Sequence, residues 1–350
     1  MSQNFTKICS NFESELKLAL GAQPAAGIFI ICDDNARSLC YPTLADYEFL
    51  RGSHLITIPA GDEHKNIDTA VRLWKYLSEN GATRKSLIIN LGGGMVTDIG
   101  GFVASAFKRG VRYINLPTTL LGAVDAATGG KTGINFFGLK NEIGVFNPAS
   151  DVLINIDFFR SLDAPNLRSG YAEMVKHALI DSRNEWHAVL AFDLDTPDYE
   201  KLGVLTGRSV QIKERIVAQD PTEKSIRKAL NLGHTIGHAF ETFSHQSGRP
   251  ALHGYAVMWG LLCELYLSHC KLNFPKEELL RLKTMTKEFY GIFVIDCADY
   301  DTLYELMTHD KKNDSDEINF TLLSDVGEIH INQTATKAEI FDALDFYMMG

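Results

Sequence analysis

Three histidines and one glutamate have the residue types and spacing of a metal site. In the segment NLGHTIGHAFE, His234 and His238 are four residues apart, so they share one face of a helix. His253 precedes Gly254 at an expected helix start, and Glu173 lies in the helical segment YAEMVKHALI. Two imidazoles and one carboxylate, with a fourth position open, are typical of a catalytic zinc site. The absence of an HExxH motif disfavours a zinc protease, and each histidine alone is also compatible with a structural or surface role.

A glycine run is the first candidate for binding a cofactor phosphate. Gly92-Gly93-Gly94 joins an expected strand to an expected helix, where the backbone can approach an anion closely. The GxGxxG fingerprint is incomplete, because Thr97 takes the place of its third glycine. The run is equally compatible with a tight turn alone, and Asp98 with an acid favoured near a helix start.

Two threonines follow the next expected strand. Thr118 and Thr119 come directly after Pro117, at the sheet edge where ligands of open α/β sheets bind. Such threonines more often cap a helix than bind a ligand. The segment GGKT that contains Lys131 has the ending of a P-loop, but Asp125 stands where the earlier glycine is required, so we exclude a nucleotide triphosphatase.

Cationic residues lie in or beside these motifs, although the chain has a net charge of −10. They are Arg109, Lys131, Lys140, Lys176, Lys213, Arg227, Lys311 and Lys312. Each alone is most simply a solvated surface charge. Gathered beside a metal and a cofactor, they predict a substrate that carries carboxylate or phosphate groups. So acidic a chain is a poor general binder of nucleic acid.

The elements that must position these residues change in kind along the chain. Strands are expected over residues 27–32, 55–59, 86–91 and 111–116, with helices over 68–80 and 97–107. This alternation predicts a parallel sheet covered by helices. Later in the chain, helices are expected over residues 166–180, 199–218, 226–244, 254–267 and 276–290, with a strand over 318–323. We predict an α/β domain over residues 1–160 and a mainly α-helical domain over residues 161–350.

The composition narrows the class of protein. The 350 residues are 45% hydrophobic and 22% charged, which is typical of a soluble globular protein and excludes a collagen-like or wholly disordered chain. The apolar runs are too short to span a bilayer, and residues 1–13 lack the apolar core of a signal peptide, so we expect a cytoplasmic protein with no membrane partner. The six cysteines form no CxxC pair, which favours free thiols.

Together the motifs resemble the 3-dehydroquinate synthases, a family of sugar-phosphate cyclases. The matching segments cover roughly residues 60–320 in the family's order and spacing: LGGGMVTDIGGFVASAFKRG, INLPTTLLGAVDAATGGKTGIN, LKNEIGVFNP, GYAEMVKHALI, RKALNLGHTIGHAFE, LHGYAVMWG and DKKN. The resemblance implies an N-terminal NAD-binding α/β domain, a C-terminal, mainly helical metal-binding domain, and a homodimer.

The resemblance also assigns roles to individual residues. It implies that Zn²⁺ or Co²⁺ is bound by Glu173, His234 and His253. It implies NAD contacts from Asp62, Lys65, Gly93, Gly94, Met95, Asp98, Thr118, Thr119, Lys131, Lys140, Phe158 and Ser161. It implies substrate contacts from Arg109, Asp125, Lys131, Asn141, Lys176, Lys213, Arg227, Asn231, His238, Lys311 and Lys312. Four of these, Lys131, Asn141, Lys176 and His238, are candidate catalytic residues, with His238 as the proton-transfer group.

The implied reaction belongs to the shikimate pathway of aromatic amino acid biosynthesis. 3-Deoxy-D-arabino-heptulosonate 7-phosphate would be converted to 3-dehydroquinate and phosphate, with a transient oxidation at C5 by NAD⁺. The chain departs from the family's pattern at Asp62, at Ala126-Ala127 and at Gly138-Leu139, none of which is a metal ligand or a matched cation.

Three other functions stay open at this point. A 2-deoxy-scyllo-inosose or valiolone synthase would share the fold, metal and NAD but differ in its substrate pocket. A metal-dependent polyol dehydrogenase would release NADH. A catalytically inactive binding protein would not need the metal residues and cations together.

Overall fold

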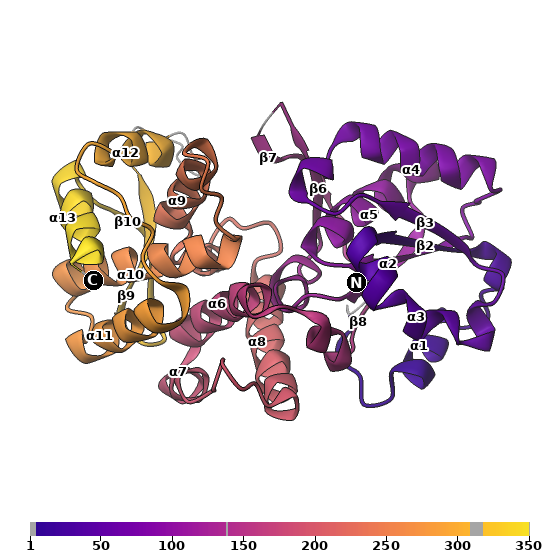
Figure 1. Cartoon of the computed structure of the whole chain (residues 1–350), viewed down its shortest axis with the longest axis horizontal. Helices are drawn as coiled ribbons and strands as arrows, with labels where there is room; N and C mark the ends of the chain where they lie inside the picture. Colours follow the sequence, from indigo (N-terminus) through magenta and orange to yellow (C-terminus); the bar gives the residue numbers. More distant parts are fainter. Residues whose placement is uncertain (1–4, 138, 309–317, 350) are drawn as a thin grey trace. The chain divides into compact units, whose positions relative to one another are not determined.

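The computed structural model describes residues 5–137, 139–308 and 318–349. The chain divides into two compact units, Met1–Asp163 with Asp198–Glu214, and Ala164–Pro197 with Arg215–Gly350 (Figure 1). The second segment of the first unit belongs to the helix α8 (Tyr199–Gln219). The functional division into residues 1–160 and 161–350 stays a prediction.

The first unit is built on a parallel sheet, as the alternation of strands and helices predicted. Its strand order is β1-β8-β5-β4-β2-β3, and every pair in it is parallel. The strands are β1 (Phe5–Ile8), β2 (Ile28–Asp33), β3 (His54–Ile58), β4 (Leu87–Gly92), β5 (Arg112–Pro117) and β8 (Asp151–Ile154). All residues of β4 are buried, which is why its sequence is almost wholly apolar.

Helices pack on this sheet and connect its strands. They are α1 (Phe12–Leu20), α2 (Asp34–Leu39), α3 (Tyr41–Ala45), α4 (Ile67–Glu79) and α5 (Gly94–Ala106). The helix α5 packs on β4 and β5. It begins three residues earlier than the predicted Thr97, because the backbone turns into the helix directly at Gly93 and Gly94.

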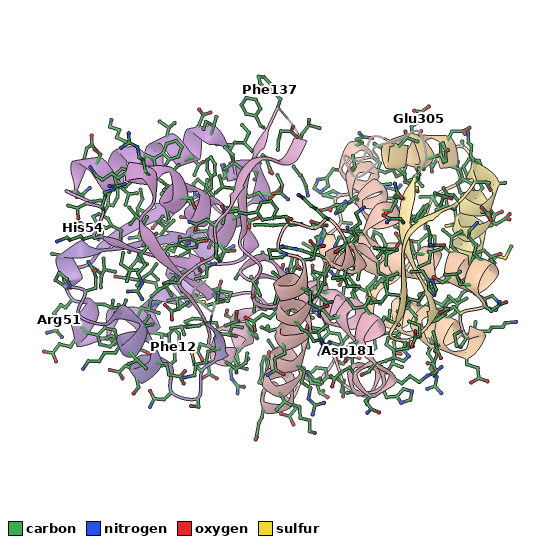
Figure 2. The ribbon with its side chains drawn as sticks, turned by 180° about the vertical axis from the view of Figure 1, so that it is seen from behind. Phe12, Arg51, His54, Phe137, Asp181 and Glu305 are labelled. Atoms are coloured by element: carbon green, nitrogen blue, oxygen red, sulfur yellow. The ribbon has the colours of Figure 1, made fainter. Side chains whose placement is uncertain are left out.

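A hairpin that sequence patterning did not predict extends from the first unit. It pairs β6 (Lys131–Phe136) with β7 (Leu139–Phe146) in antiparallel register. Most of β7 is exposed, so it lacks the apolar alternation by which a half-buried strand is recognised. Phe137 lies at the end of this hairpin and is 89% exposed (Figure 2).

The second unit is mainly helical, as predicted. Its helices are α6 (Ala164–Asp181), α7 (Arg183–Leu190), α9 (His234–Gln246), α10 (His253–Leu272), α11 (Lys276–Met285), α12 (Tyr300–Thr308) and α13 (Lys337–Met348). A small antiparallel pair, β9 (Asn319–Asp325) and β10 (Glu328–Thr334), completes it. The helix α10 packs against α6, α9 and α13, so it lies at the centre of this unit.

Two predicted helices differ from the observed elements. The single helix predicted over residues 226–244 is wrong: a 3-10 segment, η7 (Ile226–Asn231), is followed by α9. The break lies at Gly233, whose φ of +79° is left-handed and ends any continuous right-handed helix. The helix predicted over residues 276–290 is α11 followed by a π-helical turn, η8 (Thr286–Tyr290).

The helices α9 and α10 approach each other through glycines. A Cβ added at Gly260 would overlap the carbonyl oxygen of Gly233 and lie 2.6 Å from the amide nitrogen of Gly237. A Cβ added at Gly237 would lie 3.0 Å from the carbonyl oxygen of Ala256. Any larger side chain would therefore force the backbones apart.

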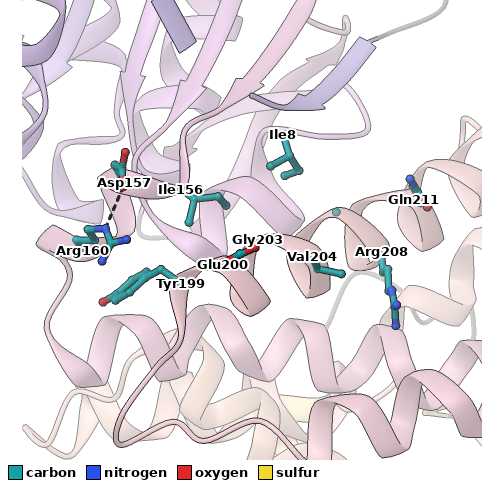
Figure 3. Close-up of a pocket in the computed structure, with 11 residues that line it drawn as sticks. Ile8, Ile156, Asp157, Arg160, Tyr199, Glu200, Gly203, Val204, Arg208 and Gln211 are labelled. Atoms are coloured by element: carbon teal, nitrogen blue, oxygen red, sulfur yellow. Dashed lines mark hydrogen bonds and ion pairs between the residues drawn. The ribbon is translucent and has the colours of Figure 1, made fainter. Parts of the chain in front are cut away.

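A shallow apolar pocket lies elsewhere in the first unit. It is formed by β1, by η6 (Ile156–Ser161) and by α8, with Arg160 hydrogen-bonded to Asp157 at its rim (Figure 3). None of the residues predicted to contact the cofactor is among those that line this pocket.

Two further expectations concern thiols and membranes. All six cysteines are free, as predicted. Among the described residues, no helix combines the length and the apolar character that crossing a bilayer requires.

We predict that the same substitution has opposite effects at two helical glycines. Gly260→Ala gains up to about 1 kcal/mol of helix propensity but overpacks the contact of α10 with α9, at a cost of about 1–3 kcal/mol. Gly207→Ala in α8 gains the same propensity, and its new Cβ meets only an ordinary contact, 3.4 Å from Ile8 Cγ1. The urea midpoint of unfolding should fall for Gly260→Ala and should stay equal or rise for Gly207→Ala. A midpoint for Gly260→Ala at or above that of the unmodified protein would show that the glycine contact is not tight.

Candidate active site

Glu173 lies on the buried helix α6 of the second unit. Its side chain is fully buried, and the Lys176 ammonium, one turn along the same helix and 1% exposed, pairs with its Oε2. Its Oε1 faces two imidazoles, with the Nε2 atoms of His234 and His253 each 3.3 Å away. The two oxygens of one carboxylate therefore have different partners, Lys176 on one side and the histidines on the other.

His234 is the first residue of α9, and its ring orientation is fixed by a backbone acceptor. Its Nδ1 lies 3.2 Å from the carbonyl oxygen of Leu232. A carbonyl can only accept, so the neutral ring carries its proton on Nδ1 and presents the lone pair of Nε2 to Glu173.

His253 is the first residue of α10, and its Nδ1 is held by a second carboxylate. This atom lies 3.1 Å from Oε2 of Glu241 on α9, so it keeps its proton. Nε2 of His253 then faces the same place as Nε2 of His234. Sequence reasoning missed Glu241, although its position seven residues after His234 and three after His238 puts it on the same helical face.

The electrostatics of the three groups are strongly coupled. Burial acts to raise the pKa of Glu173, but the Lys176 ammonium and the two imidazoles hold it well below the ordinary value. Burial and Lys176 lower the pKa of His234 to about 4. Burial also acts to lower the pKa of His253, but Glu241 and Glu173 raise it to about 10. Glu173 is therefore ionised and His234 neutral at pH 7.

This donor set fits a divalent transition metal ion. One oxygen and two imidazole nitrogens lie within 4.8 Å of one another. Neither buried oxygen of Glu173 accepts a hydrogen bond of normal geometry. With no metal bound, a proton on His253, whose pKa is raised to about 10, offsets the charge of Glu173, and a divalent cation bound by the same three atoms would replace that proton. Glu173, His234 and His253 are the residues predicted as ligands.

The structure places further predicted residues in the second unit. The ring of His238 lies 5.3 Å from that of His234 and 6.0 Å from that of His253, measured between centroids. Arg227 and Asn231 belong to η7. Arg227 is buried and donates to the carbonyl oxygen of Pro221 at 2.7 Å, and Asn231 donates to Glu223 Oε1 at 3.0 Å. Lys311 and Lys312 lie outside the described residues.

A polar cluster in the first unit brings together three predicted residues. The buried Lys65 Nζ donates to Asp98 Oδ2 at 3.1 Å and to Asn141 Oδ1 at 2.6 Å. Burial raises the pKa of Asp98 to about 6, although Lys65 acts in the opposite direction. Asn141, predicted to contact substrate, thus lies beside two residues predicted to contact NAD.

The hairpin holds other predicted residues near this cluster. Lys140 Nζ lies 3.8 Å from Asp62 Oδ2. Asn135 donates to Asp62 Oδ2 at 2.9 Å and accepts from the amide of Asn141 at 3.0 Å. Asp62, where the chain departs from the family's pattern, is therefore hydrogen-bonded to the hairpin. Lys131 is an exposed residue at the start of β6.

The glycine turn is packed against the threonine segment. The amide of Thr118 donates to the carbonyl of Gly92 at 2.9 Å. A Cβ at Gly93 would lie 3.0 Å from Thr119 Cγ2, and one at Gly94 would lie 3.0 Å from Cβ of Ala126, a position where the chain departs from the family. Met95 lies in the first turn of α5, which begins without a side-chain cap. Steric crowding at Gly93 and Gly94 therefore requires glycine in this turn, a reason that the sequence alone could not show.

Five further predicted residues of the first unit lie outside the Lys65 cluster. Lys213 on α8 pairs with the Asp125 carboxylate and donates to its carbonyl oxygen at 2.5 Å. Arg109 is exposed and has a left-handed φ of +67°. Phe158 and Ser161 lie in η6, where the Ser161 hydroxyl donates to the carbonyl of Phe158 at 2.6 Å.

Comparison with known proteins gives the family. Residues 55–169 match the family described as 3-dehydroquinate synthase N-terminal, and residues 170–313 match 3-dehydroquinate synthase C-terminal. The chain is 52% identical over 347 residues to a 3-dehydroquinate synthase of Parabacteroides distasonis, covering 99% of this chain and 98% of that protein.

Two solved structures have the same fold. One is a 2-epi-5-epi-valiolone synthase of Streptomyces hygroscopicus with NAD⁺ and Zn²⁺ bound, with a TM-score of 0.85, 26% identity and coverage of 100% of this chain and 98% of that one. The other is a 2-deoxy-scyllo-inosose synthase complexed with carbaglucose-6-phosphate, NAD⁺ and Co²⁺, with a TM-score of 0.85, 22% identity and coverage of 97% and 95%. The family matches and the near full-length identity show that this chain belongs to the 3-dehydroquinate synthase family.

Proposed function

We propose that this chain converts 3-deoxy-D-arabino-heptulosonate 7-phosphate to 3-dehydroquinate and phosphate, as a phosphate-eliminating carbon–oxygen lyase that uses NAD⁺ and a divalent metal ion. The observation that carries the proposal is the convergence of Glu173, His234 and His253 on one buried place. It is supported by the 52% identity to a curated 3-dehydroquinate synthase.

Glu173 Oε1 and the Nε2 atoms of His234 and His253 would hold a zinc or cobalt ion. When bound there, such an ion lowers the pKa of a coordinated hydroxyl group and so favours its oxidation at neutral pH. Lys176 holds the other oxygen of Glu173, which keeps the carboxylate ionised and oriented. Glu241 does the same for His253 through Nδ1.

The NAD⁺ site is proposed in the first unit, around the glycine turn, Thr118, Thr119 and the Lys65 cluster. These residues would hold NAD⁺, which when bound would supply reversible hydride transfer at C5 of the substrate and so be needed only in catalytic amount. Lys65 would present a buried, oriented ammonium and fix the carboxylate of Asp98. The 26% identical valiolone synthase, which has NAD⁺ and Zn²⁺ bound, supports both cofactors.

The substrate is an anionic sugar phosphate, and the chain offers oriented cations for it. Lys176 and Lys213 are buried and held by carboxylates, and the buried Arg227 is held by a backbone carbonyl. Their proposed role is to bind phosphate and carboxylate groups and to fix the reacting conformer. His238, next to the ligand histidines, is the proposed proton-transfer residue.

Two other properties rest on the sequence alone. The homodimer and the cytoplasmic location stay predictions. Two alternative activities can be distinguished by experiment. A polyol dehydrogenase would release NADH, and another cyclase would act on a different substrate.

We predict that the purified protein releases phosphate from the heptulosonate phosphate only when NAD⁺ is supplied or already bound. Phosphate should accumulate for many turnovers per NAD⁺, while absorbance at the NADH wavelength shows no steady rise. A rise in NADH that matches product would favour a dehydrogenase. If the protein releases no phosphate from the heptulosonate phosphate but converts the sugar 6- or 7-phosphate that another cyclase uses as substrate, a different synthase would be favoured.

We predict that His253→Ala removes bound metal and nearly all turnover while the protein stays folded, because two ligands of three cannot hold the ion tightly. Metal content by atomic emission and phosphate release report the two effects. His245→Ala is the matched control, since His245 is an exposed histidine of α9 outside the site, and it should keep both. Stoichiometric metal in active His253→Ala would make the ligand assignment wrong.

A further inference from the structure

The helix that carries His234 begins without a side-chain cap of its own. Its N-cap residue is Gly233, with a left-handed φ of +79°. A Cβ at this position would lie 2.6 Å from Leu261 Cγ and 3.1 Å from the Leu261 amide nitrogen. Backbone conformation and space both require glycine here, so the side chain that normally accepts the first free N–H groups of a helix is missing.

Glu264, on α10, supplies this cap from another helix. Its Oε2 accepts the amide of Gly233 at 2.6 Å, and its Oε1 accepts the amide of Ile236 at 3.1 Å. These are the N-cap and N3 amides, which a capping box satisfies with two local side chains. The same chain has such a box in α13, from Thr336 and Glu339. Glu264 thus does with one buried carboxylate what α13 does with two residues.

The charge of Glu264 suits this place. Its side chain has no exposed surface, and burying a carboxylate is costly unless hydrogen bonds and favourable charge compensate. The N-terminus of α9 provides both, as aligned N–H groups and as the positive end of the helix dipole.

His234, the proposed metal ligand, and Thr235 lie between the two capped amides. The backbone of His234 lies next to Gly233, whose amide is held, and the Nδ1 of its ring is anchored to the carbonyl of Leu232, one residue further back. The position of this short segment therefore sets where Nε2 points. A carboxylate that fixes the segment also fixes the ligand.

We propose that Glu264 is a positioning residue for the metal ligand His234, and that α9 and α10 each position the other's ligand histidine. Glu241 of α9 holds the ring of His253 on α10, and Glu264 of α10 holds the start of α9 that bears His234. This inference rests on the metal site of the proposed function.

The test compares two buried glutamates of the same unit by metal binding. Glu264→Gln keeps the size of the side chain but loses the charge and places an amide group against a backbone N–H. Glu278→Gln is the matched control: Glu278 lies on α11, is 5% exposed and accepts from Trp186 Nε1 at 2.7 Å, so it stabilises the unit without contacting α9 in this way. Zn²⁺ affinity is measured by chelator competition, and the visible spectrum of bound Co²⁺ reports ligand geometry.

We expect Glu264→Gln to weaken Zn²⁺ binding about tenfold or more and to change the Co²⁺ spectrum. Glu278→Gln should lower thermal stability but leave the affinity within about twofold and the spectrum unchanged. If Glu264→Gln lowers stability yet binds Zn²⁺ as tightly as the unmodified protein, with the same spectrum, the residue is only structural and the inference is overturned.

A second variant covers a failure of Glu264→Gln to fold. Glu264→Asp keeps the charge but is shorter by one methylene, so it should fold, bind Zn²⁺ with reduced affinity and show a shifted Co²⁺ spectrum. An unchanged affinity and spectrum in Glu264→Asp would also overturn the inference. Failure of the unmodified protein itself to bind Zn²⁺ would instead count against the proposed function.

Discussion

Two imidazole nitrogens and one carboxylate oxygen converge in one buried place, and the proposed chemistry depends on this convergence. Each ring can bind an ion only through Nε2, because Nδ1 of His234 faces a carbonyl and Nδ1 of His253 faces a carboxylate. Both Nε2 atoms then lie 3.3 Å from the same oxygen of Glu173. A carboxylate oxygen beside two imidazole nitrogens is a donor set typical of a divalent metal ion, and a bound ion would replace the proton that the raised pKa of His253 keeps there.

The second unit is organised around this convergence. The two proposed ligand histidines start the helices α9 and α10, whose backbones meet at Gly233, Gly237 and Gly260. So close a contact leaves no space for a capping side chain at Gly233, and Glu264 of the opposite helix caps the start of α9 instead. The first unit follows a different principle: a tight glycine turn and the buried Lys65 lie at the carboxyl edge of a parallel sheet, where open α/β sheets bind ligands.

Sequence patterns predict elements better than they predict contacts between elements. Four of the six strands of the sheet, β2, β3, β4 and β5, and the shared face of His234 and His238 follow from local periodicity and agree with the structure. The strands β1 and β8 were not predicted, because each has only four residues, too few for a clear pattern. The break at Gly233 was missed because a left-handed glycine has no signature in an otherwise helical sequence. Glu264 was missed for a related reason: it lies 31 residues after the amide that it caps, so no spacing rule connects them. The hairpin of β6 and β7 was missed because its exposed strand, β7, lacks apolar alternation.

The most direct measurement is a crystal structure of the zinc-loaded protein with anomalous data at the zinc edge. The account predicts one strong peak bonded to Nε2 of His234, Nε2 of His253 and Oε1 of Glu173, at about 2.0–2.2 Å. Both Nδ1 atoms should keep their present acceptors, Leu232 and Glu241. A zinc ion bonded through either Nδ1, or held by His238 in place of Glu173, would contradict it.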